Sequence, residues 1–435
     1  MRRTLERYFE FPALGTDWRT EILAGVTTFM TMAYIVFVNP SILAETGMPL
    51  EAVTAATCLS AAVGSFLMGG YARYPIALAP GMGLNAYFAY TVVKGMGIAW
   101  QAALGAVFIS GVAFFVLTLI GVRQLIISAI PFELYAAVAG GVGLFIALIG
   151  FRNSGIIVPS AATTVTLGNL RDPHTLLAIG GLLLTAALLA WRVRGAMVVG
   201  ILATALAGFA TGVVSWTPHP YSLGALAGTA FKLDIASSLR LGFLEIIFVF
   251  LFIDMFDNIG TLVAVGKKAE LFDHAHQIPR VNRILLSDAT ATAAGSLAGT
   301  STVVSYIESA AGVAAGGRSG VTAIVTGLLF LAALFIAPLV GAIPHAATAP
   351  ALIIVGSMMA TTMAEINWKN PELAIPAFLI LMGIPLTFSI ANGLAFGFTA
   401  YTLLKLARGK FREVNWFVYA LTALFILRFA YLSQG

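Results

Sequence analysis

Long apolar stretches alternate with short polar ones along nearly the whole 435-residue chain. Most stretches are close to the ~20 residues that a helix needs to cross the hydrocarbon core of a bilayer. Apolar residues run on within each stretch, so the pattern predicts an all-α polytopic membrane protein and argues against an outer-membrane barrel. The predicted segments are 21–43, 51–69, 75–93, 99–121, 132–150, 175–191, 196–214, 242–266, 282–298, 300–316, 320–341, 347–363, 371–406 and 415–432.

Segment 371–406 is too long for one straight span, because about 25 residues is the usual upper limit for a membrane helix. We expect this segment to break near residues 389–392 and to form two short helices. The pattern as a whole predicts about 14 membrane-embedded elements, since each needs about 20 residues. It does not decide whether the last element spans fully.

Two segments, one in each half of the chain, contain poor helix formers. Residues 75–83 include Pro80, which lacks a backbone donor, and residues 299–306 are rich in β-branched side chains. Irregular backbone at membrane depth occurs where it is buried in protein or lines a cavity. Paired interrupted segments in two halves therefore point to the substrate site of a transporter.

The two halves also match weakly in sequence. Residues 64–69 resemble residues 295–299, and Asn85 corresponds to Glu308, each just past its interrupted segment. Seven segments precede the second half, so the repeats are expected to be inverted across the membrane. Small residues recur in every membrane helix, and the glycine-serine match alone would not distinguish a repeat from that background.

Composition and charge narrow the class of protein further. Of all residues, 59% are hydrophobic and 10% are charged, which excludes soluble globular and disordered chains. The single cysteine, Cys58, excludes a disulfide scaffold. Basic residues gather within 2–19, 267–283 and 405–412, which places the N-terminus in the cytoplasm and predicts a multi-pass plasma (inner) membrane protein. The net charge of +5 therefore suggests no nucleic acid partner, and no cleavable signal peptide is expected.

Four acids fall well within apolar segments, whereas Glu133 and Glu245 lie near segment ends. A charged side chain at the bilayer centre costs about 2.5–3.5 kcal/mol, so each needs a partner. Apart from Arg283 at the end of segment 282–298, the spans that hold the four acids contain no lysine or arginine, so the acids must take a proton, bind a cation or accept N–H bonds from a ligand. All five histidines lie in or beside loops, and we expect no cofactor, metal site or catalytic residue. The four acids are Asp254, Asp257, Asp288 and Glu308.

These residue types favour a planar heterocycle over an inorganic anion. A carboxylate accepts parallel N–H bonds from a ring edge, and Asn85 offers both a donor and an acceptor. An anion site would instead need positive charge. Asp254 and Asp257 share one helix face, although a polar packing pair would look the same. Glu308 and Asn85 also fit ordinary helix caps, and Asp288 fits a structural role better.

The chain resembles the bacterial and fungal adenine/guanine/hypoxanthine permeases, which belong to the nucleobase–cation/ascorbate symporter superfamily. The motifs that carry the resemblance are FMTMAYIVFVNPSIL (29–43), APGMGLNAYFAY (79–90), FIDMFDNIGTL (252–262), STVVSYIESAAGVAAGGRSG (301–320) and SIANGLAFGF (389–398). They occur in the family's order along essentially the whole chain. No motif position departs from the family's pattern.

The resemblance implies 14 transmembrane segments arranged as two inverted seven-segment repeats. Segments 3 and 10 would each be a short strand followed by a half-helix. A core domain would combine 21–121 (segments 1–4) with 242–341 (segments 8–11). A gate domain would combine 132–214 (segments 5–7) with 347–432 (segments 12–14). Relatives are homodimers within membrane lipid that move the core against the gate in an elevator-like cycle.

The resemblance also implies a function, which is the import of purine nucleobases by proton symport. Asn85, Asp254 and Glu308 correspond to positions that contact the purine, and Asp257 corresponds to an acid essential for transport. Tyr306 and Ile307 occupy positions whose backbone lines the base. Proton coupling or support of the site would fall to Asp257 and Glu308, and the division of roles between the two aspartates stays open.

Three alternatives remain at the level of sequence. A carrier of the same fold could take uracil, xanthine or an inorganic anion, although an anion carrier would have no need of Glu308. A membrane enzyme acting on lipid or peptide would need clustered histidines or a metal-ligand spacing, and none stands out. A passive channel would not need titratable pairs beside broken helices. The sequence does not rank adenine, guanine and hypoxanthine or give the proton stoichiometry.

Overall fold

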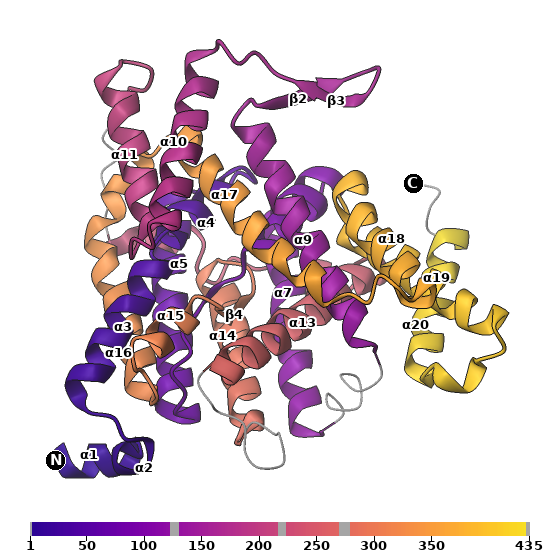
Figure 1. The fold of residues 1–435 in the computed structure, drawn as a ribbon, viewed down its shortest axis with the longest axis horizontal. Coiled ribbons are helices and arrows are strands. Elements are labelled where there is room, and N and C mark those ends of the chain that lie inside the picture. The colour runs from indigo at the N-terminus through magenta and orange to yellow at the C-terminus, as the bar shows by residue number, and fades with distance from the viewer. Residues whose placement is uncertain (1, 122–129, 216–222, 269–278, 432–435) are drawn as a thin grey trace. The chain divides into compact units, whose positions relative to one another are not determined.

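The computed structural model describes residues 2–121, 130–215, 223–268 and 279–431, and these are mostly helical (Figure 1). The chain forms two compact units, which we describe separately. The larger unit comprises residues 1–116 and 149–354, and the smaller unit comprises 117–148 and 355–435. Helices α7, α9 and α17 pass from one unit into the other; they span Trp100–Leu119, Phe132–Asn153 and His345–Ala360.

The first part of the larger unit follows the predicted segments closely. Two short helices precede the first long one, and α5 and α6 each continue into a π-helix. The elements are α1 (Arg2–Tyr8), α2 (Phe11–Leu14), α3 (Trp18–Met32), α4 (Ile35–Ala44), α5 (Leu50–Phe66), η1 (Leu67–Ala72), β1 (Leu78–Pro80), α6 (Met82–Ala86) and η2 (Tyr87–Gly95). The first span therefore consists of two helices that meet at residues 33–34.

The second part of the larger unit repeats the order of long helix, strand and half-helix. Its elements are α13 (Leu244–Lys268), α14 (Val281–Ala298), β4 (Val303–Ser305), α15 (Ser309–Ala314), α16 (Gly320–Ala333) and η5 (Leu334–Ala342). Between the two parts lie β2 (Ile157–Ser160), β3 (Thr164–Leu167), α10 (Pro173–Ala190), α11 (Ala196–Ala210), η3 (Leu223–Gly228), α12 (Ile235–Ser238) and η4 (Leu241–Phe243). Strands β2 and β3 form a separate antiparallel hairpin.

Strands β1 and β4 lie inside the two stretches that the sequence marks as poor helices. They pair antiparallel, with Leu78 opposite Ser305 and Pro80 opposite Val303, and every residue of both strands is buried. Side chains of neighbouring helices complete the pairing, since the N–H of Leu78 donates to the hydroxyl of Ser65 at 3.1 Å. The backbone groups thus find partners within the protein, as irregular backbone at membrane depth requires. Figure 1 shows β4 beside α14, and both strands lead directly into half-helices, α6 and α15. The pairing thus brings the two interrupted segments together.

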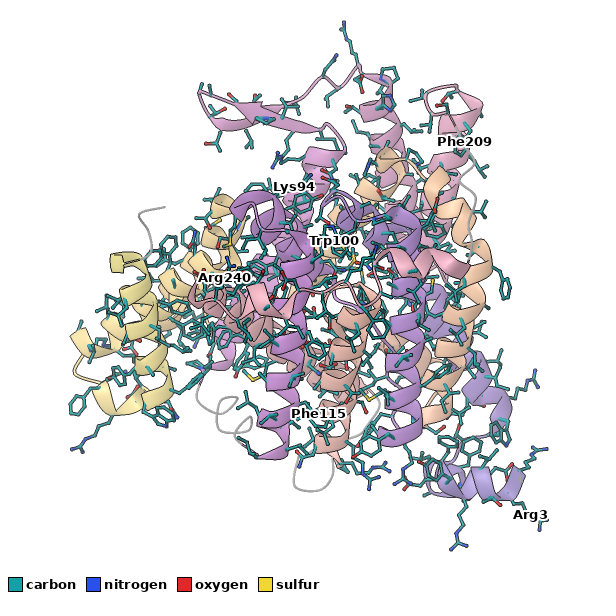
Figure 2. All side chains as sticks on the ribbon, turned by 180° about the vertical axis from the view of Figure 1, so that it is seen from behind. Arg3, Lys94, Trp100, Phe115, Phe209 and Arg240 are labelled. Carbon is teal, nitrogen blue, oxygen red and sulfur yellow. The ribbon has the colours of Figure 1, made fainter. Side chains whose placement is uncertain are left out.

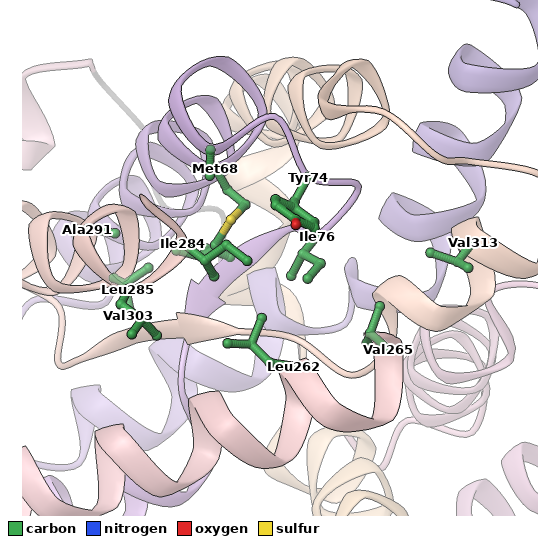
Figure 3. Packing of buried hydrophobic residues seen from close by; sticks show 12 residues of the cluster. Met68, Tyr74, Ile76, Leu262, Val265, Ile284, Leu285, Ala291, Val303 and Val313 are labelled. Atoms are coloured by element: carbon green, nitrogen blue, oxygen red, sulfur yellow. The ribbon is translucent and has the colours of Figure 1, made fainter. Parts of the chain in front are cut away.

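A cluster of buried apolar side chains surrounds the strand pair (Figure 3). Leu78 and Val303 come from the strands, and Leu262 and Val265 come from one face of α13. The remaining members come from α5–η1 and the loop after it, and from α14 and α15: Met68, Ala72, Tyr74, Ile76, Ile284, Leu285, Ala291 and Val313. The strands and the start of each half-helix are therefore held by packing from several long helices.

Close contacts between helices depend on glycine at a few positions. A Cβ on Gly312 in α15 would lie 2.7 Å from the carbonyl oxygen of Ala24 and would also meet the hydroxyl of Thr28, both on α3. Half-helix α15 therefore lies directly against α3. The opposite case is Gly70 in η1, where an added Cβ would meet nothing within 4 Å.

The smaller unit contains a helical hairpin that confirms the predicted break in segment 371–406. Helix α18 (Pro371–Thr387) ends at Phe388, whose φ of 49° is left-handed. Ser389 then caps helix α19 (Ile390–Ala407), and its hydroxyl accepts a hydrogen bond from the N–H of Asn392. Three more elements complete this unit: η6 (Thr361–Glu365), η7 (Phe411–Glu413) and α20 (Trp416–Tyr431). Helix α19 ends at Ala407.

Seven helices within the described residues are long and apolar enough to cross a membrane. Four shorter apolar helices accompany them, α11, α16, α18 and α20. Large apolar side chains project from the helices (Figure 2), and several are exposed, such as Leu183 on α10 and Leu206 on α11. Exposed apolar side chains on spanning helices are what contact with lipid requires, so the chain is a multi-pass membrane protein.

Candidate functional site

The carboxylate of Glu308 lies between β4 and α15, on the residue that precedes the half-helix. Its Oε1 atom accepts a hydrogen bond of 2.8 Å from the hydroxyl of Tyr34. The Glu308 side chain makes no capping hydrogen bond to the N–H groups of α15, so the interpretation as a simple helix cap is wrong. The first predicted site residue is thus held by a neutral phenol from the other half of the chain.

Asn85 lies in α6, directly after β1, within a chain of buried side-chain hydrogen bonds. Its Nδ2 atom donates to Oδ1 of Asn39, and its Oδ1 atom accepts from the hydroxyl of Ser301. The Nδ2 atom of Asn39 lies 2.7 Å from the hydroxyl oxygen of Thr57 and 3.1 Å from that of Thr300. Because an amide nitrogen carries two hydrogens, one N–H of Asn85 remains beyond its bond to Asn39.

Asp254 is buried on α13 and is connected to strand β4 through Thr292. The Thr292 hydroxyl oxygen lies 3.3 Å from Oδ2 of Asp254 and 3.0 Å from the carbonyl oxygen of Val303. The same hydroxyl accepts the N–H of Val303 at 3.2 Å. A single hydroxyl proton serves one of the two acceptors at a time, so Thr292 couples the Asp254 carboxylate to the strand.

Asp257 follows one turn later on α13 and is partly exposed, and it lies within electrostatic reach of the phenol of Tyr306. The buried Tyr306 donates its hydroxyl to the carbonyl of Pro80 at 2.5 Å and its N–H to the carbonyl of Ala77 at 3.0 Å. Ile307 is 48% exposed. Tyr306 therefore holds the backbone just before Glu308 against strand β1 and the residue that precedes it. The Ile307 side chain lies outside the packed core.

The structure brings most of the predicted site residues into one region of the larger unit. Helix α13 packs against α6, β4 and α15, which between them carry or adjoin Asn85, Tyr306 and Glu308. Asp288, for which a structural role was expected, accepts a hydrogen bond of 3.4 Å from the hydroxyl of Ser305 on β4. Within the described parts of the chain, neither Asp257 nor Glu308 makes an ion pair.

Sequence reasoning missed several polar residues around this region. Tyr34 and Asn39 stand inside the motif at 29–43, yet nothing in one sequence indicates that they reach Glu308 and Asn85. Asn258 is fully buried on α13, and neither of its amide atoms has a hydrogen-bond partner in the described part of the protein. Its position four residues after Asp254, on the same helix face, was the available signal.

Among the described residues, no group of three or more histidine, cysteine, aspartate or glutamate side chains is arranged to hold a metal ion. The chemistry of the region therefore consists of carboxylates, carboxamides and hydroxyls enclosed by apolar packing. Such groups present hydrogen-bond acceptors with few competing cations, and they complement a neutral ligand that has N–H donors on a planar edge.

Residues 19–396 match the model of a family described as the Permease family. The chain belongs to this family. It is 52% identical over 430 residues to a putative permease of Methanocaldococcus jannaschii, with 99% of each chain covered. It is 46% identical over 445 residues to the guanine/hypoxanthine permease PbuG of Bacillus subtilis (99% of this chain, 100% of the relative). It is 42% identical over 429 residues to the adenine permease AdeP of Escherichia coli K12 (99% and 96%).

Membership of the Permease family makes the protein a membrane transport protein and not an enzyme. Two solved structures share its fold at low sequence identity. The transmembrane domain of the cyanobacterial bicarbonate transporter BicA has a TM-score of 0.63 at 14% identity, covering 87% of this chain and 98% of that one. The murine anion transporter Slc26a9 has a TM-score of 0.66 at 10% identity, covering 94% and 72%.

Proposed function

We propose that this permease imports purine nucleobases, namely adenine, guanine or hypoxanthine, across the plasma membrane. The observation that carries the proposal is the Glu308 carboxylate, which lies beside an antiparallel strand pair and is held by the neutral hydroxyl of Tyr34. Support comes from relatives at 42% and 46% identity over nearly the whole chain, which are adenine and guanine/hypoxanthine permeases.

In this proposal the purine takes the place that a basic partner would otherwise fill. Glu308 and Asp254 accept N–H groups from the ring edges, and the remaining N–H of Asn85 donates to a ring nitrogen or carbonyl. The backbone of Tyr306 and Ile307 lines the base. Fixed donors and acceptors in an enclosed region discriminate strongly between ligands, because a ligand whose donors and acceptors do not match leaves a buried polar group of the protein unpaired.

Transport is proposed to be proton-coupled, with Asp257 and Glu308 taking up and releasing the proton. Acids within the membrane that lack ion-pair partners commonly form proton relays. A charged carboxylate is costly to move within the membrane, and either a bound proton or N–H donors from a ligand offset that cost. Symport requires that the purine and the proton be bound together, so in this proposal one of these two acids holds the proton while the purine's N–H groups are bound at the site.

The remaining architecture is proposed on the family resemblance and the strand pair. Fourteen segments would form two inverted repeats, with 21–121 and 242–341 as the core and 132–214 and 347–432 as the gate. The equivalent order of long helix, strand and half-helix in the two parts of the larger unit supports the repeat. Basic clusters near the N-terminus support a cytoplasmic N-terminus. A homodimer in membrane lipid with an elevator-like cycle completes the proposal.

The alternative within the same fold is a carrier of uracil, xanthine or an inorganic anion. The likeness to the bicarbonate and anion transporters concerns the fold alone, since sequence identity is 14% or less. The carboxylates of Asp257 and Glu308, which make no ion pair within the described residues, would repel an anion, so the site residues argue against an anion carrier.

Competition for uptake tests the proposal. In this experiment, uptake of labelled hypoxanthine is measured in cells or proteoliposomes that contain the protein. Unlabelled adenine, guanine, xanthine or uracil is added in excess, with and without a protonophore. We expect adenine or guanine to compete and the protonophore to abolish accumulation. Competition by uracil alone would overturn the substrate, and continued accumulation after collapse of the proton gradient would overturn the coupling.

A further inference from the structure

The first span bends where α3 ends at Met32 and α4 begins at Ile35. Side chains in this bend and in α4 contact candidate site residues from both parts of the larger unit. Tyr34 lies in the bend and is 1% exposed. It reaches Glu308, at the start of the half-helix from the second part of the chain. Asn39 lies further along α4, is fully buried, and reaches Asn85 in the half-helix from the first part. The bend and the short helix after it thus contact one polar residue in the first half-helix and one directly before the second.

The hydrogen bond from Tyr34 makes the two carboxylate oxygens of Glu308 inequivalent. Oε1 accepts from the phenol at 2.8 Å, and Tyr34 is the one side-chain donor to this carboxylate among the described residues. Oε2 is left to face another donor. A fixed phenol also restricts rotation of the carboxylate, because turning the carboxylate plane away would break a hydrogen bond to a charged group.

The contact between Asn39 and Asn85 fixes an amide in the same way. Asn39 offers its oxygen to the Nδ2 of Asn85, and its own Nδ2 is held by the hydroxyls of Thr57 on α5 and Thr300 before β4. With its oxygen engaged by Ser301, Asn85 cannot flip without losing two hydrogen bonds. The network therefore selects which amide atom of Asn85 presents a free hydrogen.

We propose that Tyr34 and Asn39 are positioning residues for substrate recognition, Tyr34 directing Oε2 of Glu308 and Asn39 directing the second N–H of Asn85 towards the purine. This inference rests on the proposed function. In this proposal the first span contributes to purine recognition without touching the purine. The proposal also explains why two uncharged side chains of this span contact residues in or next to both half-helices. Loss of either residue should weaken purine binding while leaving the moving parts of the carrier intact.

Tyr34→Phe is the decisive variant, because it removes one oxygen atom and keeps the ring that packs in the bend. Its matched control is Tyr419→Phe, which removes a hydroxyl bonded at 2.9 Å to the carbonyl of Phe411 in the smaller unit. Purified full-length proteins are reconstituted in nanodiscs for hypoxanthine binding and in proteoliposomes for uptake. We expect Tyr34→Phe to raise both Kd and KM roughly tenfold, as for loss of a hydrogen bond to a charged group, with little change in maximal rate. Tyr419→Phe should match the wild type.

A double-mutant cycle separates positioning from general damage to the structure. In a Glu308→Gln background, Tyr34→Phe should weaken hypoxanthine binding by less than about twofold, because the carboxylate that it orients is gone. Asn39→Ala and Asn85→Ala should show the same lack of additivity. If Asn39→Ala does not fold, Asn39→Ser, which keeps a small polar group, takes its place.

The outcomes distinguish this inference from the proposed function. Wild-type protein that binds neither hypoxanthine nor adenine would overturn the proposed function and this inference with it. Wild-type protein that binds purine, with Tyr34→Phe and Asn39→Ala indistinguishable from Tyr419→Phe, would overturn the inference alone. Full additivity in the double-mutant cycles would do the same, since it would assign the effect to the fold.

Discussion

Two glutamates of this protein begin helices in similar sequence settings, yet their surroundings differ completely. Glu372 stands in the first turn of α18 in the smaller unit, where its side chain is 4% exposed and forms ion pairs with Lys405, Arg408 and Lys410. Glu308 precedes α15 in the larger unit, where it is held by a phenol and makes no ion pair within the described residues. From this difference we infer that Glu372 serves the structure of its unit, and we propose that Glu308 binds a ligand.

A third glutamate sharpens the comparison. Glu21 on α3 is fully buried, and its carboxylate accepts hydrogen bonds from the N–H groups of Arg318 and Ser319 and from the hydroxyl of Thr322. It thereby caps α16, so burial alone does not identify a functional acid. The distinguishing feature of Glu308 is that, within the described residues, Tyr34 is the one side chain that donates a hydrogen bond to its carboxylate.

The largest expected effect comes from removing charge at the proposed site. Glu308→Gln and Asp257→Asn should each lower hypoxanthine uptake about 10- to 100-fold, because each replaces an acceptor of charge-assisted bonds with an amide. The Glu308→Gln variant should also lose the pH dependence of uptake. Initial rates in proteoliposomes across a pH series measure both effects.

The control for this prediction is Glu372→Gln. It should lower the thermal midpoint of the purified protein, because three cations then lose their shared partner, but it should leave the KM for hypoxanthine unchanged. Wild-type uptake and pH dependence in Glu308→Gln and Asp257→Asn would show that the site has been assigned to the wrong acids. A change in KM in Glu372→Gln would remove the contrast between the two glutamates.

A smaller effect is expected from the packing that holds Glu308 in place. Gly312→Ala would drive a Cβ against Thr28 and the carbonyl of Ala24, so α15 must shift away from α3. We expect a loss of about 1–3 kcal/mol in the free energy of unfolding, as for other overpacked contacts, together with weaker purine binding. Gly70→Ala is the matched control, since it meets no atom within 4 Å, and it should leave both quantities at the wild-type value. Equal behaviour of the two variants would contradict the close contact.

The smallest effect concerns the pH dependence of the smaller unit. A hydrogen bond of 2.6 Å from Lys405 holds the pKa of Glu413 below its usual value. A depressed pKa contributes stability above the pKa of the unfolded chain, and this contribution is lost as the pH falls through the folded value. The thermal midpoint of the wild type should therefore fall more steeply than that of Glu413→Gln between about pH 6 and pH 3. Parallel curves would mean that the ion pair between Lys405 and Glu413 contributes nothing measurable to stability.

The presence of several membrane-spanning helices was readable from the sequence, because bilayer thickness fixes helix length. The break before α19 was predicted near residues 389–392 and occurs at Phe388 and Ser389, where a left-handed residue meets a serine cap. The unusual composition of 75–83 and 299–306 likewise indicated where the helices would be interrupted. These features depend on neighbouring residues in the chain, so one sequence contains them.

The contacts that make a site out of these features were not readable. Tyr34 and Glu308 are 274 residues apart, and their hydrogen bond depends on how two helices and a strand pair pack. The amide of Asn85 is engaged by Asn39 and Ser301, while the amide of Asn258 has no partner in the described residues. The sequence alone does not distinguish these asparagines, because tertiary packing decides which polar groups find hydrogen-bond partners.

The pairing of β1 with β4 also has a consequence for biosynthesis. Strand β1 is made early, but its partner, residues 303–305, leaves the ribosome only after more than half of the chain has been inserted. During that interval the backbone groups of β1 have no strand to pair with, and apolar lipid offers them no hydrogen bonds. The nascent first half must therefore bury the unpaired edge of β1 among its own helices, or keep it in contact with the insertion machinery, until β4 has been inserted. Truncated chains ending before β4 would therefore be expected to become substrates for membrane quality control.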